Sequence, residues 1–308
     1  MLLFIFGLLG MVIGLTWMRL SLSNLLRHRL SRRLAELSDS PCFGFLLGIL
    51  CATLLQGSSA VTLLTIGLVS SRILTFPQSI AILLGANVGT CSTIPLLLAL
   101  PLDNIIFLRP YLAVLIIIFY LIPRTRSLGG AIGGLCLMLL GFDTLHQAGN
   151  TLLQQSQLLA LLDYADTNPA IAIGCGSLLT FALQSASSST LLLTAFCEES
   201  LLAPHTICHL IYGNNIGSCL SSLLVSSAAP LAGKMTALAN LLLNIGGTLL
   251  FFPLTDVFTH LATNLSLTPS EQLVFYHTMF NLISALLLLP FTHSYAQLIE
   301  WLCMKRKA

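Results

Sequence analysis

Apolar residues fill most of the chain in runs of about twenty, and short polar stretches separate these runs. A helix needs about 20 mostly apolar residues to cross the ~30 Å hydrocarbon layer of a membrane. Seven runs satisfy this length and are predicted to be full spans: residues 1–20, 78–100, 104–122, 129–146, 203–226, 236–253 and 273–290. The pattern therefore predicts an all-α integral membrane protein.

Two further apolar stretches, residues 43–70 and 170–197, differ because polar residues interrupt each of them near its centre. The interruptions are "QGSS" at 56–59 and "QSASSS" at 184–189. Each stretch is too long for one crossing and too short for two. We therefore predict two re-entrant helical hairpins, each of which enters the membrane and returns to the side it came from.

The composition supports the membrane class. Only 8% of the residues are charged and 56% are hydrophobic, whereas a soluble domain carries about a quarter charged residues. The net charge of +2 is spread over short loops, so no nucleic-acid-binding patch is predicted. The nine cysteines form no CxxC pair and are interpreted as packing residues instead of disulfides or metal ligands.

The basic residues predict the orientation. If both hairpins return to their starting side, twelve of the thirteen Lys and Arg residues lie on one side, and only Arg109 lies on the other. The positive-inside rule makes the first side cytoplasmic, with the N-terminus outside and the C-terminus inside a bacterial inner membrane. This layout puts Arg19 at the cytoplasmic end of the first span, and it leaves no Lys or Arg near the centre of a hairpin.

The chain contains an internal repeat with a shift of 128 residues. Three spans and one hairpin in each copy force the second copy to enter the membrane from the opposite side, an arrangement typical of secondary transporters. We predict a first repeat at 1–126, a second, inverted repeat at 127–255 and an additional span with a short tail at 256–308. The identities that carry the repeat are Gln56/Gln184, Ser59/Ser187, Thr62/Thr190, Gly85/Gly213, Asn87/Asn215, Gly89/Gly217 and Cys91/Cys219.

The two interruptions are candidate binding sites. The N-termini of the second half-helices and the serine hydroxyls suit an oxyanion, and freed carbonyls with side-chain oxygens suit a hard monovalent cation. Co-bound cations would offset the ~3 kcal/mol or more that a charge costs inside a membrane. Capping and helix packing are the alternative explanation. The candidates are Gln56, Gly57, Ser58, Ser59, Thr62, Gln184, Ser185, Ser187, Ser188 and Thr190, with Na+ sites among Gln56, Ser59, Gln184 and Ser187.

A second pair of motifs, "GANVGTCST" at 85–93 and "GNNIGSCLS" at 213–221, supplies supporting residues. We expect Asn87 and Asn215 to bridge to the hairpin tips. Two other functions are weighed against transport by symport: a transporter or channel for another small anion, and an intramembrane serine protease with His209 or His277 as base. The protease needs one nucleophile and one base, not two mirrored clusters. The supporting residues are Asn87, Thr90, Asn215 and Ser218.

Together these motifs resemble those of the sodium-dependent phosphate cotransporter family, the type II Na/Pi group, in its bacterial form. The resemblance implies Na+-coupled symport of inorganic phosphate, with both hairpin tips forming the site, Na+ as coupling ion, no other cofactor and no catalytic residue. Gly57 and Ala186 depart from the family's Gln-Ser-Ser-Ser signature, and each removes a hydroxyl. The partners expected are phosphate, sodium ions and membrane lipid, with no nucleic acid, and a homodimer is left open.

Overall fold

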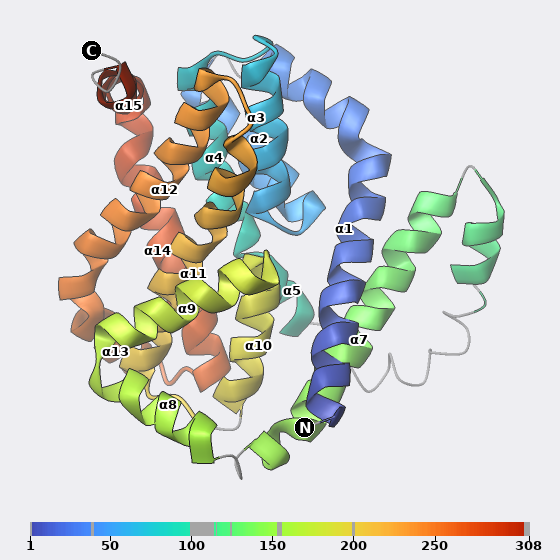
Figure 1. The fold of residues 1–308 in the computed structure, drawn as a ribbon, viewed down its shortest axis with the longest axis vertical. Coiled ribbons are helices and arrows are strands. Elements are labelled where there is room, and N and C mark those ends of the chain that lie inside the picture. The colour runs from blue at the N-terminus through green and yellow to red at the C-terminus, as the bar shows by residue number, and fades with distance from the viewer. Residues whose placement is uncertain are drawn as a thin grey trace.

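The computed structural model describes residues 2–37, 40–98, 114, 116–123, 125–152, 156–198 and 201–304, and this part of the chain contains helices and no strands (Figure 1). The prediction of an all-α protein is confirmed there. The helices are α1 (Leu2–Leu37), α2 (Pro41–Leu55), α3 (Ser58–Ser70), α4 (Phe76–Thr90), α5 (Thr93–Leu98), α7 (Arg126–Leu152), α8 (Ser156–Thr167), α9 (Pro169–Leu183), α10 (Ala186–Glu198), α11 (Pro204–Ser226), α12 (Leu231–Phe251), η1 (Phe252–Leu254), α13 (Thr255–Asn264), α14 (Pro269–Leu288), η2 (Leu289–Phe291) and α15 (Thr292–Met304).

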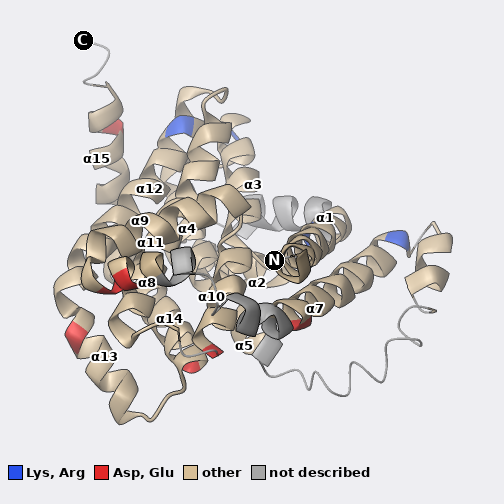
Figure 2. Ribbon diagram, turned by 60° about the horizontal axis from the view of Figure 1, so that its bottom comes forward, with Lys and Arg blue, Asp and Glu red and all other residues tan. Residues whose placement is uncertain are grey.

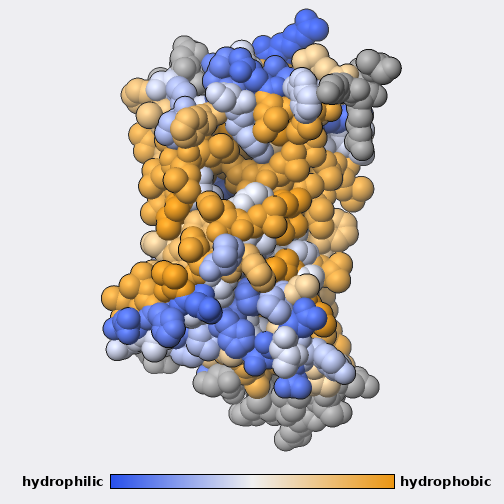
Figure 3. Space-filling view, turned by 90° about the vertical axis from the view of Figure 1, so that its left-hand side faces the viewer, coloured by the Kyte–Doolittle hydropathy of each residue, from blue (hydrophilic) through white to orange (hydrophobic). Residues whose placement is uncertain are grey.

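A broad band of apolar side chains separates two polar ends on the face shown in Figure 3. Such a band is expected of a protein that lies in a membrane. Five segments of the described chain are long and apolar enough to cross it. They coincide with five of the seven expected spans: Leu2–Leu25, Phe76–Leu96, Arg126–Leu145, Leu231–Asn264 and Pro269–Met304.

The two remaining spans are not confirmed. The run at 203–226 does form a single helix, α11, but this helix is not among the five apolar segments. Its buried residues include His209, Asn214 and Asn215, so its polar side chains face other helices and lower its hydropathy. The run at 104–122 lies mostly outside the described residues.

Helices α1 and α7 pack closely because glycines face each other across the contact. A Cβ atom on Gly14 would lie 2.2 Å from the backbone nitrogen of Met138, and one on Gly141 would lie 2.2 Å from that of Met11. Small residues allow such backbone approach between membrane helices. This pairing joins the two segments that the 128-residue shift aligns, and it places α1 beside the centre of the molecule (Figure 1).

Two helix pairs, α2–α3 and α9–α10, form where the sequence predicts hairpins. Pro41 and Pro169 stand at the first helical positions of α2 and α9, where a missing N–H costs nothing. Both first helices end at a glutamine in the left-handed region, with φ 53° at Gln56 and φ 50° at Gln184. A non-glycine residue in this conformation ends a helix sharply, and each chain then turns back into a second helix.

The helix that follows each pair packs on it through the same contacts. A Cβ on Gly85 of α4 would lie 1.9 Å from the carbonyl oxygen of Phe45 in α2. A Cβ on Gly213 of α11 would lie 2.0 Å from the carbonyl oxygen of Ile173 in α9. Both glycines and both carbonyls differ by 128 residues, so the sequence repeat corresponds to repeated packing. Only glycine allows this approach.

The C-terminal part also contains two similar units. Helices α12 and α14 each run into a 3-10 turn that contains a proline, Pro253 or Pro290, and a further helix follows. Proline removes a backbone donor, which interrupts an α-helix without requiring the chain to reverse. In the sequence, "ANLLLN" at 239–244 and "YHTMFN" at 276–281 are each followed, nine residues after the last Asn, by Pro253 or Pro290. This spacing corresponds to the repeated helix, turn and helix.

Candidate functional site

The tips of the two helix pairs meet near the centre of the molecule, as Figure 1 shows for the α2–α3 and α9–α10 junctions. Ser187 Oγ, in the first turn of α10, donates a hydrogen bond of 3.3 Å to the carbonyl oxygen of Gln56. The same hydroxyl lies 3.5 Å from Thr93 Oγ1 of α5. Residues separated by 131 positions are thus brought together, and the junction is polar on both sides.

Arg19 of α1 also reaches this junction, which corrects the expectation that no Lys or Arg lies near a hairpin centre. Its Nε and Nη2 donate to the carbonyl oxygen of Gln56 at 2.8 and 2.6 Å. Its Nη1 donates to Ser185 Oγ at 2.8 Å. Helix α1 continues from Leu2 to Leu37, so Arg19 lies midway along it instead of at its cytoplasmic end.

The two glutamines share a backbone conformation but differ in their side chains. Gln56 Nε2 donates to the carbonyl oxygen of Thr53 at 2.7 Å, which turns the amide toward its own helix. Gln184 is exposed. The carbonyl oxygen of Gln56 therefore faces the other tip, while its side-chain amide does not.

The second tip carries a compact group of serine hydroxyls. Ser185 Oγ accepts bonds from the backbone N–H of Ser188 at 3.0 Å and from its hydroxyl at 2.9 Å. Ser185, Ser187 and Ser188 are all buried. This group stands at the N-terminus of α10, where backbone N–H groups and the helix dipole favour an anion.

The first tip presents fewer side chains. Ser58 and Thr62 are buried in α3, Ser59 is partly exposed, and Gly57 has extended backbone. A Cβ on Gly57 would lie 2.7 Å from Arg19 Nη2. The guanidinium group therefore fills the space that a side chain at position 57 would need.

The supporting asparagines do not bridge to the tips as expected. Asn87 Nδ2 donates to Asn240 Oδ1 of α12 at 3.2 Å, and Asn215 Oδ1 accepts from Asn281 Nδ2 of α14 at 3.1 Å. Both amides thus tie the repeated motifs to the C-terminal helices. Thr90 and Ser218 donate to carbonyl oxygens of their own helices, as buried hydroxyls in membrane helices commonly do.

Asn214, which has no asparagine counterpart in the first repeat, makes the bridge in the second repeat. It is fully buried, and its Nδ2 donates to Thr190 Oγ1 of α10 at 2.6 Å. Its Oδ1 accepts from Thr180 Oγ1 of α9 at 2.7 Å. One side chain of α11 therefore holds both helices of the second pair on either side of their break.

Neither histidine is placed to activate a serine of the tips. His209 packs its ring 6.0 Å from that of Tyr212 and 5.5 Å from that of Phe252. Among the described residues, no hydrogen bond joins His209 or His277 to Ser58. The described part of the chain also holds no group of three His, Cys, Asp or Glu residues that could bind a metal ion.

The sequence pattern of the Na+/Pi-cotransporter family matches this chain twice, over residues 11–147 and 144–267. The chain belongs to the Na+/Pi-cotransporter family. The expected resemblance is thus confirmed, and it identifies the chain as a membrane transport protein. Membership in this family suggests phosphate transport and argues against an enzyme.

Relatives from bacteria cover nearly the whole chain. YqeW of Bacillus subtilis strain 168 is 29% identical over 294 residues, 94% of both chains. The Escherichia coli K12 protein named "Putative inorganic phosphate export protein YjbB" is 27% identical over 299 residues, which are 94% of this chain but 54% of that protein. The chain therefore spans about half the length of the YjbB relatives.

A human relative shares a shorter segment. "Sodium-dependent phosphate transport protein 2B" is 37% identical over 59 residues, 19% of this chain and 9% of that protein. No solved structure matches the chain. The Na+/Pi-cotransporter assignment thus comes from sequence, and the geometry of the tips comes from this structure.

Proposed function

We propose that this chain carries out Na+-coupled symport of inorganic phosphate, with phosphate and sodium bound between the two tips. The observation that carries the proposal is the contact between Ser187 and Gln56, because it unites the two interruptions in one polar junction. The proposed binding residues are those of the two breaks: Gln56, Gly57, Ser58, Ser59, Thr62, Gln184, Ser185, Ser187, Ser188 and Thr190.

The chemistry of the junction suits phosphate. Helices α3 and α10 both begin there, so two positive dipole ends and several hydroxyls converge on one region. Sodium would bind to carbonyl and hydroxyl oxygens, with Ser187 Oγ and the side-chain oxygen of Gln56 as candidates, because the Gln56 carbonyl already accepts two bonds from Arg19. Ser59 and Gln184 are the further candidate ligands of sodium. They would join the other two residues around one ion only after the tips rearrange.

The helix lengths support re-entrant hairpins in the membrane. Helix α2 has 15 residues and α3 has 13, about 22 and 20 Å at 1.5 Å per residue. Each is shorter than a ~30 Å hydrocarbon layer, so each pair would enter and return. We propose seven full spans beside the hairpins, in repeats at 1–126 and 127–255 followed by 256–308. The two matches to the family and the repeated glycine contacts support this division.

The charges at the two ends support the proposed orientation. Arg72 follows α3, and Lys234 lies in the first turn of α12, whereas α8 and α13 carry acidic residues (Figure 2). These groups lie at opposite ends of the molecule (Figure 1). By the positive-inside rule the Arg72 end is cytoplasmic, which puts the N-terminus outside and the C-terminus inside a bacterial inner membrane.

Phosphate flux into proteoliposomes tests the proposal. We expect radiolabelled phosphate to accumulate under an imposed Na+ gradient and not under an equal K+ gradient. Loading the vesicles with phosphate and reversing the gradient tests movement in the other direction, which the name of the YjbB relatives suggests. Flux that is equal with and without Na+ would reject symport.

Two single variants connect this flux to the site. We expect Ser187→Ala to reduce Na+-driven flux, because it removes the hydroxyl that joins the tips. Ser227→Ala, an exposed serine after α11, is the matched control and should transport normally. Equal flux in both variants would reject the site at the tips.

A transporter for another small anion is the second candidate, because Gly57 and Ala186 each remove a hydroxyl that the family signature has. The same assay separates the two functions. Inhibition of phosphate flux by excess unlabelled phosphate but not by sulfate or nitrate supports phosphate, and stronger inhibition by another anion would assign that anion instead.

A further inference from the structure

Among the residues that the structure describes, one positive charge lies at the junction of the tips, and it comes from outside both helix pairs. Arg72 and Lys234, by contrast, lie next to helix ends. Arg19 donates three hydrogen bonds, two to the first tip and one to the second. The 128-residue shift aligns Arg19 with Gln147, so the second repeat has no counterpart of this charge.

The guanidinium group has N–H groups left that can donate to a further acceptor. It has five N–H groups, and the three bonds to Gln56 and Ser185 use one each. No carboxylate among the described residues lies within ion-pair distance of Arg19. Two N–H groups of one arginine match the oxygens of a phosphate ion, and such charge-assisted pairs are the strongest polar contacts available to an oxyanion.

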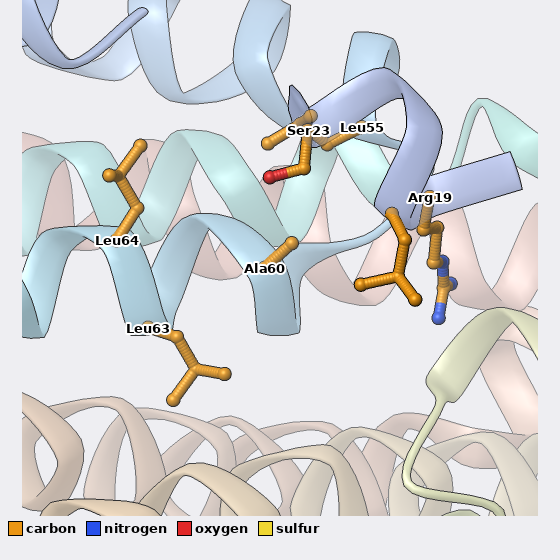
Figure 4. A pocket seen from close by; sticks show the side chains of 7 residues that line it. Arg19, Ser23, Leu55, Ala60, Leu63 and Leu64 are labelled. Carbon is orange, nitrogen blue, oxygen red and sulfur yellow. The ribbon is translucent and has the colours of Figure 1, made fainter. Parts of the chain in front are cut away.

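A cavity leads to this arginine. It has a volume of about 320 Å³ and is lined by Arg19, Leu20 and Ser23 of α1 and by residues at the end of α2 and along α3. Figure 4 shows Arg19 at one end of the cavity, with Ala60, Leu63 and Leu64 following α3 away from the tip. Since α3 ends next to Arg72, the cavity extends from the tips toward the basic end of the molecule.

We propose that Arg19 binds the transported oxyanion with its two remaining N–H groups, at the end of the cavity beside it. This assignment rests on the proposed function and adds a residue that lies outside the recurring motifs. Gly57 is part of it, because a Cβ at that position would lie 2.7 Å from Arg19 Nη2 and the guanidinium group would have to shift. The fixed charge offsets part of the charge of the anion, so the sodium ions need not do so alone.

Equilibrium binding of radiolabelled phosphate to the purified protein in Na+ tests the proposal. Arg19→Gln should weaken binding roughly tenfold to a hundredfold, the usual effect of losing hydrogen bonds from a charged group. Arg19→Lys should be intermediate, since it keeps the charge and loses the fork of donors. Lys234→Gln, which removes an exposed cation at the same end, is the matched control and should bind like the wild type.

A double-mutant cycle tests whether Gly57 affects phosphate binding through the arginine. Gly57→Ser should weaken phosphate binding in the wild type, because its Cβ would displace the guanidinium group. In Arg19→Gln the same change should have little effect, since the space is free. Additive losses would overturn the proposal. Should Arg19→Gln not fold, Arg19→Lys and Gly57→Ser still give the comparison.

The outcomes also separate this proposal from the proposed function. Phosphate binding that is equal in the wild type and in Arg19→Gln overturns the role of Arg19 and leaves phosphate transport intact. A wild type that binds sulfate in place of phosphate, with the same dependence on Arg19, rejects phosphate as substrate and supports the arginine as the oxyanion residue. A wild type that binds neither anion rejects both.

Discussion

At the scale of single residues, the amide of Asn214 holds the second tip in shape. It contacts a hydroxyl on each side of the break, Thr180 Oγ1 and Thr190 Oγ1. We expect Asn214→Ala to destabilise the protein by about 1–3 kcal/mol, because it leaves two buried hydroxyls without this partner. Thermal unfolding in detergent measures the loss, and the exposed Asn264→Ala is the control. Equal melting temperatures for the two variants would show that the bridge contributes nothing.

Aligning the two repeats identifies polar residues that are present in both copies, but not those that are present in only one. Asn214 aligns with Ala86 in the first repeat and Arg19 with Gln147, so neither forms a matched pair. Arg19 also follows an apolar run of the right length, which predicts a position at the end of a span. The signal that could have placed it is the lack of any Gly or Pro between Arg19 and Pro41, which lets the helix continue past the arginine.

At the scale of helices, both repeats depend on one kind of glycine contact. Gly85→Ala and Gly213→Ala each place a Cβ within 2.0 Å of a carbonyl oxygen on the neighbouring helix. We expect each to cost about 1–3 kcal/mol, the usual effect of overpacking, and to lower the melting temperature by similar amounts. Gly174→Ala has no atom within 4 Å of the new Cβ, so it should be neutral or stabilise α9 by about 0.5–1 kcal/mol. A loss in only one repeat would contradict the equivalence of the two contacts.

The helix pairs could be predicted because their signal is local. A glutamine followed by small hydroxyl residues inside an apolar run conflicts with a continuous membrane helix, and the structure turns at that glutamine in both pairs. The partners of Asn87 and Asn215 could not be predicted in this way. These partners, Asn240 and Asn281, lie on α12 and α14. Whether an asparagine contacts a tip or a later helix depends on packing between segments that are more than 60 residues apart in the sequence.

At the scale of the whole molecule, the proposed inverted repeat predicts that α2–α3 and α9–α10 enter from opposite sides of the membrane. The end of α3 and the start of α9 should therefore be reached by reagents from different sides. Arg72 lies just after α3, and Asp166 lies just before α9 in α8. Both positions are exposed, so each can carry a reporter cysteine.

Labelling from each side with a membrane-impermeant maleimide measures this. In a background with the non-buried cysteines Cys42, Cys136, Cys175 and Cys303 replaced by serine, we expect Asp166→Cys to react in intact cells. Arg72→Cys should react only in inverted membrane vesicles, because the positive-inside rule places the basic end in the cytoplasm. The unsubstituted background is the control for reaction at the five buried cysteines. Reaction of both cysteines from the same side would show that the pairs do not oppose each other. Reaction with the sides exchanged would keep the opposed tips and reverse the orientation, which would make the cavity beside Arg19 open outward.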